Sequence, residues 1–136
     1  MAQRQGRGPV EFEMRIPAQA GQLRSVRNAL SGWLDGSGAP PEVGKEVALA
    51  VHEAAANSVE HAYPRSTGDL IVRARHDDGR LEVVVEDEGE WRPPSRTDQR
   101  GRGLALMHGL MDDVEIAPAA SGSGTRVTLR KRVGRR

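Results

Sequence analysis

The sequence predicts an α+β domain, a two-layer sandwich in which about three helices cover one face of a mixed, mostly antiparallel sheet. Three observations predict this fold. Short segments that alternate apolar and polar residues, as half-buried strands do, are interspersed with segments whose apolar residues recur at helical spacing. The tripeptide Asp77-Asp78-Gly79 joins two strand-like segments and is typical of a tight antiparallel hairpin. Aromatic residues make up only 3% of the 136 residues, so the core must be aliphatic.

Hydrophobic periodicity places the first strand and the first two helices. Residues 10–16 alternate between apolar and charged side chains, and Pro17 ends this strand. Residues 23–34 carry leucine or valine every three or four positions, and a stretch rich in glycine and proline ends this helix. A second helix is expected at about 42–61, with valines, alanines and Ser58 forming one face of small residues.

The second half of the chain predicts four strands, a long loop and a third helix. The strands are expected at 70–75, 81–86, 114–117 and 125–131. Residues 87–102 are polar or glycine and proline with almost no apolar residue, and a loop of this length in a compact domain is usually functional or disordered. The third helix is expected at 103–111, and the turn 121–124 leads into the last strand.

Composition bounds the protein class. No stretch approaches the roughly 18 consecutive apolar residues that would cross a bilayer, and the N-terminus lacks the apolar segment of a signal peptide. The chain has no cysteine, so any catalysis must use oxygen or nitrogen groups, and a reducing cytoplasm is permitted. We therefore expect a cytoplasmic protein without a membrane contact, with one domain at 9–132, a disordered N-terminus at 1–8 and a basic tail at 133–136.

Basic residues gather at the C-terminus, although the formal net charge is only +1. From Arg126 to Arg136 there are six arginines or lysines and no acid. Such a segment could contact the phosphates of a nucleic acid, or it could be a solvated strand edge and a frayed terminus. Because aromatic residues that could stack on bases are almost absent, we expect no direct binding of nucleic acid.

The second helix carries a polar stripe whose spacing places Glu46, Glu53, Asn57 and Glu60 on one face. Such a stripe is often only a solvated face. Here, however, a carboxylate and a carboxamide lie one turn apart and are surrounded by alanines. A carboxamide oxygen can bind a hard cation such as Mg²⁺, and a carboxylate one turn away can accept a proton.

Three further clusters are each weak signals by themselves. Asp87 and Gly89 stand where a strand ends, so the carboxylate could accept a hydrogen bond from an exocyclic amine while the glycine lets a flat ring approach. The tripeptide Gly101-Arg102-Gly103 stands immediately before the third helix, where free N–H groups bind phosphate. Gly124-Thr125 opens the last strand. Each of these clusters is also compatible with an ordinary turn.

In this order and at these intervals, the four clusters together resemble the N, G1, G2 and GT boxes of the GHKL ATP-binding superfamily, the Bergerat fold. The segments ALAVHEAAANSVEHAY, VVVEDEG, GRGLALMHGLMDDVEI and SGSGTRVTLR are similar to the anti-sigma-factor serine kinases of bacterial partner-switching systems. The resemblance extends from about Glu11 to Arg132, nearly the whole chain.

The resemblance implies a role for each cluster. Asn57 would bind a Mg²⁺ ion that bridges the phosphates of ATP, and Glu53 would be the general base for a serine or threonine hydroxyl of a protein. Asp87 would bind the adenine amine and Gly89 would give the ring room, while the hydroxyl of Thr125 would complete the adenine pocket.

The third helix and the loop before it would hold the phosphates. Residues 88–102 would form the ATP lid. The phosphate cradle would consist of Gly101, Arg102, Gly103 and Leu104. Four arginines are candidates for a contact with the γ-phosphate: Arg92, Arg96, Arg100 and Arg102.

The resemblance therefore implies an ATP-dependent serine/threonine protein kinase that also binds a sigma factor and phosphorylates a STAS-type antagonist protein; homodimerisation is compatible with it. Two alternatives stay open. One is a nucleotide-responsive anti-sigma switch protein without significant kinase activity, and the other is a small nucleic-acid module that ignores ATP. A sensor histidine kinase is not expected, because no helical dimerisation segment with a phospho-accepting histidine precedes the ATP region.

Overall fold

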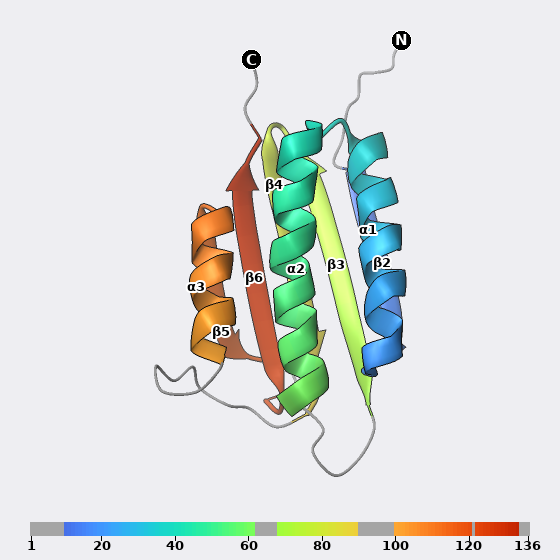
Figure 1. Ribbon diagram of the computed structural model, residues 1–136, viewed down its shortest axis with the longest axis vertical. Helices are drawn as coiled ribbons and strands as arrows, with labels where there is room; N and C mark the ends of the chain where they lie inside the picture. Colours follow the sequence, from blue (N-terminus) through green and yellow to red (C-terminus); the bar gives the residue numbers. More distant parts are fainter. Residues whose placement is uncertain (1–9, 62–67, 90–99, 121, 134–136) are drawn as a thin grey trace.

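The computed structural model describes residues 10–61, 68–89, 100–120 and 122–133 of the chain (Figure 1). The expected disordered segment at 1–8, most of the expected lid and the end of the basic tail lie outside these residues.

Five strands form one antiparallel sheet in the order β2-β3-β4-β6-β5. The strands are β2 (Val10–Pro17), β3 (Asp69–Asp77), β4 (Arg80–Asp87), β5 (Asp113–Pro118) and β6 (Thr125–Arg132). All four strand pairings are antiparallel, so the described strands contain no parallel component of the expected mixed sheet. The structure confirms the predicted α+β two-layer fold. It corrects the expectation of a strand edge at the C-terminus, because β6 lies between β4 and β5.

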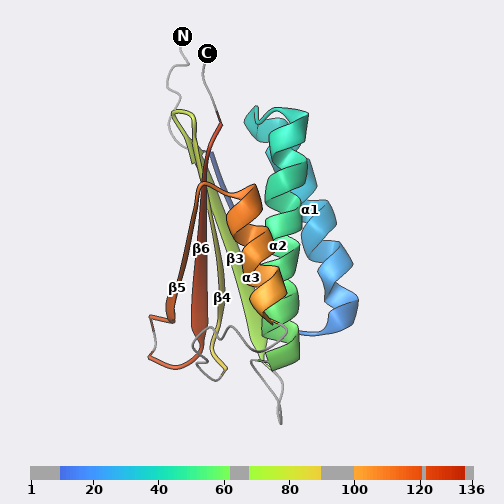
Figure 2. The same ribbon diagram turned by 60° about the vertical axis from the view of Figure 1, so that its left-hand side comes forward.

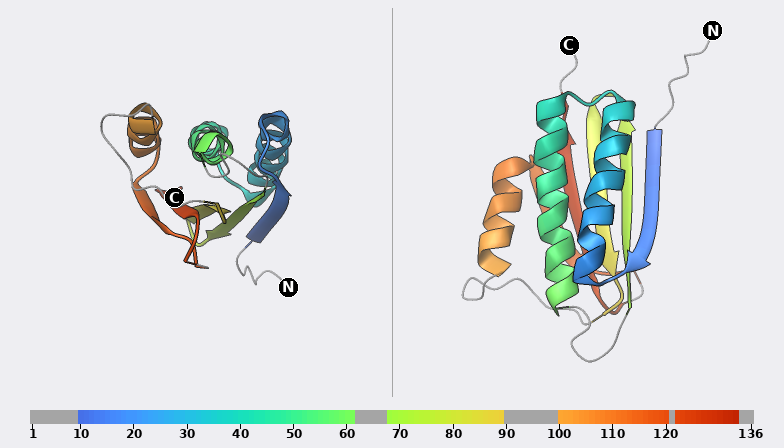
Figure 3. Two further views of the ribbon diagram at one scale, coloured as in Figure 1. Left: turned by 90° about the horizontal axis from the view of Figure 1, so that it is seen from below. Right: turned by 45° about the vertical axis from the view of Figure 1, so that its right-hand side comes forward.

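Three helices cover one face of this sheet, as Figures 2 and 3 show. They are α1 (Leu23–Ser37), α2 (Pro41–His61) and α3 (Arg100–Leu110), and a short 3-10 turn, η1 (Ala20–Gln22), precedes α1. Within the described residues, no helix is long and apolar enough to cross a membrane.

Turn chemistry explains where two of these elements begin and end. Asp78 and Gly79 have φ values of 56° and 77°, the left-handed conformation that a two-residue hairpin requires, and they join β3 to β4 as the sequence predicts. The first helix runs three residues beyond the predicted Leu34, because Ser37 donates a side-chain hydrogen bond to the Leu34 carbonyl. It ends at Gly38, which has a φ of 92°.

The third helix begins at Arg100, three residues earlier than predicted. The glycines at 101 and 103 suggested a loop, because glycine disfavours a helix by about 1 kcal/mol relative to alanine. Packing against α2 overrides that preference, since Gly103 is buried and a Cβ atom there would be in tight contact with Glu53 of α2. Residues 100–102 therefore belong to the first turn of α3 and not to a loop before it.

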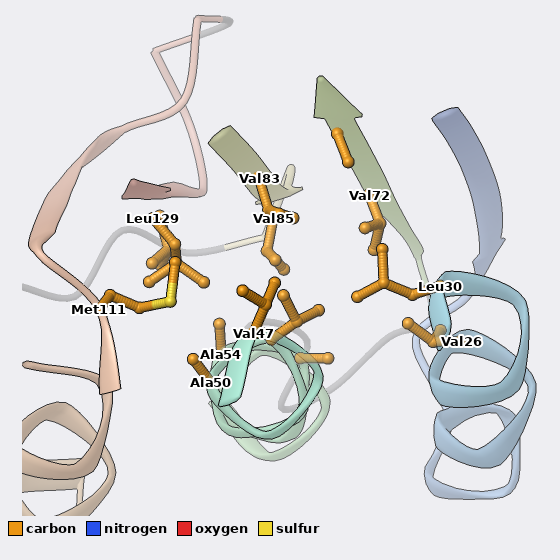
Figure 4. Packing of buried hydrophobic residues seen from close by; sticks show 14 of the residues in the cluster. Val26, Leu30, Val47, Ala50, Ala54, Val72, Val83, Val85, Met111 and Leu129 are labelled. Carbon is orange, nitrogen blue, oxygen red and sulfur yellow. The ribbon is translucent and has the colours of Figure 1, made fainter. Parts of the chain in front are cut away.

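The core lies between the sheet and the helices and is aliphatic, as the composition predicts (Figure 4). Val47 of α2 points toward Val83 and Val85 at the centre of the sheet, and Ala50 and Ala54 lie on the side of the helix nearer Met111 and Leu129. The side chains of these three α2 residues are at most 1% exposed. The second helix is consequently fixed on the sheet along its length, which positions every polar residue that it carries.

Candidate functional site

A buried carboxylate, that of Asp87, lies at the end of β4. Asp87 is 1% exposed, and its carboxylate accepts three hydrogen bonds. Ser58 of α2 donates its hydroxyl to Oδ2 at 2.7 Å, and the backbone N–H groups of Gly89 and Thr125 donate to Oδ1 at 3.1 Å each. One side chain thus connects the helix layer, the end of β4 and the start of β6.

Burial raises the pKa of Asp87 above its ordinary value, because removal from water disfavours the charged form. The hydrogen bonds from Ser58, Gly89 and Thr125 oppose this effect, and the neighbouring charge of Glu86 adds to it. The site therefore contains a desolvated acceptor whose position is set by three donors.

The turn before β6 packs directly on the backbone that follows β4. Gly124 has a φ of 84°, and a Cβ atom at this position would overlap the Asp87 carbonyl and lie 2.6 Å from the Glu88 Cα. Ser123 donates its hydroxyl to the Gly89 carbonyl at 2.8 Å. The glycine is needed for this close approach, which brings the N–H of Thr125 to the Asp87 carboxylate.

A second cluster lies where α3 begins beside α2. A Cβ atom on Gly103 would lie 3.1 Å from Oε1 of Glu53, 3.5 Å from Nδ2 of Asn57 and 3.8 Å from its Oδ1. Both side chains are half-buried. The first turn of a helix carries backbone N–H groups without intrahelical acceptors and attracts anions. A carboxylate, a carboxamide and a helix N-terminus therefore meet at one point.

The second helix connects the two clusters. Asn57 is directed toward α3, and the next residue, Ser58, is directed toward the end of β4, because consecutive residues of a helix differ by about 100° in direction. The expected polar stripe is divided between different partners: Glu46, two turns before Glu53, forms an ion pair with Lys131 at 3.1 Å.

The structure brings together most of the residues that the sequence singled out. Glu53 and Asn57 approach Gly103, while Gly89 and Thr125 approach Asp87. Leu104 lies on α3 and packs partly buried against the core.

Several expectations about individual residues need qualification. Gly101 and Arg102 lie within α3, and nothing is described of the Arg102 side chain. Thr125 reaches Asp87 through its backbone N–H, whereas the expected role of its hydroxyl stays a prediction. The candidate residues Arg92 and Arg96 lie outside the described residues.

Sequence reasoning missed the role of Ser58, which appeared only as one of the small residues on the apolar face of the second helix. Its hydroxyl is buried against Asp87. The signal was available: a hydroxyl at a core-facing position needs a hydrogen-bond partner, and a nearby carboxylate at a strand end provides one.

The described residues contain no group of three or more histidine, cysteine or acidic side chains that could hold a metal ion. Glu53 and Asn57 offer one carboxylate and one carboxamide, both hard oxygen donors. Such a set suits Mg²⁺, which usually takes one or two protein oxygens and completes its coordination with phosphates and water. It does not suit a structural zinc ion.

Replacement of Gly124 by alanine should lower the free energy of unfolding by about 2–5 kcal/mol, because it adds a left-handed residue and a steric overlap with the Asp87–Glu88 backbone. Chemical denaturation measures this loss. Gly122→Ala is the matched control, since Gly122 has a φ of 88° but no atom within 4 Å of the added Cβ. It should cost only about 1–2 kcal/mol. Equal losses in the two variants would contradict the close approach.

The Asp87→Asn variant tests the desolvated charge. Because the pKa of Asp87 is raised in the folded state, folding favours the protonated carboxyl group over the charged form. This contribution to stability is complete below the unfolded-state pKa and is lost as the pH rises through the folded-state pKa. Asparagine keeps an acceptor for Gly89 and Thr125 and can donate to Ser58. We expect the variant to be at least as stable as the wild type at pH 7, with an advantage that shrinks as the pH falls. Thermal melts from pH 4 to 8 measure this; an advantage that grows on acidification would contradict it.

Comparison with known proteins gives consistent results. The family described as histidine kinase-like ATPase domain matches residues 16–131. The serine-protein kinase RsbW of Bacillus velezensis is 35% identical over 88% of this chain and 84% of its own length, and that of Bacillus subtilis is 33% identical over the same shares.

A crystal structure of the RsbU and RsbW domains of a Mycobacterium tuberculosis protein has a TM-score of 0.75 and 28% identity. It covers 93% of this chain, which spans only 33% of that longer chain. These matches extend over nearly all the described elements and confirm the resemblance seen in the sequence. The chain belongs to the histidine kinase-like ATPase family and is a relative of the RsbW serine-protein kinases.

Proposed function

We propose that this protein is an ATP-dependent serine/threonine kinase and anti-sigma factor that binds a sigma factor and phosphorylates a STAS-type antagonist protein in the cytoplasm. Membership of an ATPase family implies the use of ATP, and the relatives are serine-protein kinases by name. The observation that carries the proposal is the approach of Glu53 and Asn57 to Gly103 at the first turn of α3.

Asp87 is suited to bind the adenine amine. An ionised carboxylate offers about four lone-pair sites, and Ser58, Gly89 and Thr125 occupy three of them. The remaining acceptor site on Oδ2 can receive an N–H of the exocyclic amine. The three protein donors hold the carboxylate in place, so its side chain need not rearrange when adenine binds.

The phosphates would lie between α2 and the first turn of α3. Asn57, together with the phosphates, would hold Mg²⁺, which neutralises charge on the phosphate oxygens when bound. The N–H groups at 100–103 and the positive end of the helix dipole would bind phosphate oxygens. The lid would comprise residues 88–99 together with the first turn of α3.

Glu53 would act on the protein substrate. Its carboxylate would accept the proton of a serine or threonine hydroxyl while the hydroxyl oxygen bonds to the γ-phosphorus and the bond to the β-phosphate oxygen breaks. Glu53 is half-buried, one turn from Asn57 and close to Gly103, which supports its proposed role as a base beside the phosphates. This placement favours a kinase over a switch protein that only binds nucleotide, because binding alone requires no base there.

Glu53→Gln should reduce phosphoryl transfer by about 10²-fold or more, since it removes the proton acceptor but keeps the shape of the side chain. Nucleotide affinity should change little. Transfer of labelled γ-phosphate to a panel of STAS domains measures the first quantity, and calorimetry with ATP and Mg²⁺ measures the second.

Asp87→Asn serves as the opposite control, because it should lose nucleotide binding and transfer together while the protein stays folded. If Glu53→Gln keeps the wild-type transfer rate, Glu53 is not the base. If the wild type binds ATP but transfers no phosphate to any STAS domain, the switch protein without kinase activity is the better description.

Gly103→Ala should lower the transfer rate by about tenfold, because the added Cβ would lie 3.1 Å from Oε1 of Glu53 and displace its carboxylate. Stability should change little, since alanine favours the helix by roughly 0.5–1 kcal/mol and offsets part of the crowding. Gly109→Ala is the matched control on the same helix: the Cβ atom added there has no neighbouring atom within 4 Å, so the transfer rate should not change. Single-turnover kinetics with the two variants measures the difference, and equal rates would contradict the close contact.

A further inference from the structure

The face of the sheet that the helices leave uncovered carries charges in alternating columns. Most charged side chains on this face change sign from one strand to the next, in the order acidic, basic, acidic, basic, acidic; Arg15 on β2 and Asp69 on β3 depart from this order but pair with each other at 3.1 Å. The columns are Glu11 and Glu13 on β2, Arg73 and Arg75 on β3, Glu82 and Glu86 on β4, Arg126 and Arg130 on β6, and Asp113 and Glu115 on β5. Opposite charges on neighbouring strands stabilise a sheet, so the face largely neutralises itself.

Ion pairs confirm that the columns contact one another. Arg130 lies 2.9 Å from Glu82, 2.7 Å from Asp113 and 3.2 Å from Glu115. On the other side of β4, Arg73 lies 3.3 Å from a Glu86 oxygen. Arg130 of β6 is therefore paired with carboxylates of both flanking strands, β4 and β5.

At one end of the sheet, two like charges are opposed on neighbouring strands. Arg80, the first residue of the acidic strand β4, is the register partner of Arg132 on β6. Neither guanidinium has an ion-pair partner among the residues that the structure describes. The acids nearby are engaged: Asp77 pairs with Arg75 at 3.6 Å, and Asp112 accepts a hydrogen bond from the Arg132 backbone N–H at 2.6 Å. Like charges directly opposite on adjacent strands are destabilising.

This arginine pair lies in a groove. The groove has a volume of about 460 Å³, and its charged lining residues are Arg80, Glu82, Asp112, Arg130, Lys131 and Arg132. Arg130 is paired with Glu82 and Lys131 with Glu46. The lining of the groove comes mainly from the start of β4 and the end of β6, the end of the sheet at the top of Figure 1. Asp87 is at the other end of β4, roughly 24 Å away for seven residues of extended strand. The groove is thus separate from the site proposed for ATP.

We propose that Arg80 and Arg132 form a docking site for an acidic segment of a partner protein, one that presents two neighbouring carboxylates to the two guanidiniums. Opposed residues of antiparallel strands have Cα atoms about 4.5–5.5 Å apart, a spacing that two neighbouring acidic side chains can match. Their binding replaces a repulsion between like charges with two charge-assisted hydrogen-bonded pairs.

The charges around the pair favour a short acidic peptide over a nucleic acid. Glu82 and Asp112 line the same groove, and Asp113 lies on the neighbouring edge strand. A duplex carries one negative charge per about 1.7 Å, so it would bring phosphates against these carboxylates. A segment with two carboxylates can reach the guanidiniums without that repulsion.

The experiment uses the full chain and a fluorescein-labelled peptide of four glutamates with blocked ends, titrated by anisotropy at low salt. We expect saturable binding to the wild type, none to the corresponding glutamine peptide, and at least tenfold weaker binding to Arg80→Glu and to Arg132→Glu. Because Arg80→Glu restores the alternation of charge, it should also raise the Tm by about 1–4 °C.

Arg27→Glu is the matched control. It makes the same change of net charge on α1, in the other layer, and should keep the peptide affinity within twofold. The proposal is overturned if the glutamate peptide does not bind, if Arg27→Glu weakens binding as much as Arg80→Glu, or if an oligothymidylate binds more tightly than the peptide through the same two arginines. ATP binding of Arg80→Glu should equal that of the wild type, so the outcome is independent of the kinase proposal.

Discussion

The interaction on which the candidate site depends is the burial of the Asp87 carboxylate between three donors. Ser58 comes from the helix layer, Gly89 from the segment after β4 and Thr125 from the start of β6. Segments distant in the sequence are thus held at one carboxylate, and an error in the position of any of them leaves a buried acceptor short of a donor. The requirement for glycine at position 124 follows from this, because only a residue without a side chain lets the turn approach β4 closely enough.

A buried charge of this kind seldom stabilises the folded state. Desolvation disfavours the ionised form, and three hydrogen bonds only partly compensate, as the raised pKa shows. The same low-dielectric surroundings strengthen a hydrogen bond from a ligand to the carboxylate. The arrangement therefore fits the role proposed for Asp87, acceptance of a hydrogen bond from the adenine amine, better than a role in folding. The aliphatic core between α2 and the sheet provides the stability that allows this arrangement.

The sequence predicts the parts of this structure that depend on local patterns. The alternation at 10–16, the leucines of α1 and the hairpin at Asp78-Gly79 all lie where periodicity and turn chemistry place them. The start of α3 depends on contacts between distant segments, so local patterns do not predict it. For Ser58 the sequence shows that a core-facing hydroxyl needs a partner, but only the fold identifies that partner as Asp87. Glycine shows the difference: at 103 it indicates a crowded helix contact, although in the sequence it resembled a loop.

The number of charges along a segment of the sequence likewise does not show which of them are free to bind a partner in the folded protein. The last strand carries an excess of arginine and lysine, which in sequence suggests a phosphate-binding tail. In the sheet, Arg130 is surrounded by carboxylates of β4 and β5, and Lys131 on the opposite face binds Glu46 and the Leu110 carbonyl. Lys131 therefore stabilises the C-terminus of α3, whose first turn forms part of the candidate site. Basic residues of one strand thus contact two faces of the molecule, and among the described residues Arg132 differs from Arg130 and Lys131 in having another arginine, Arg80, as its register partner.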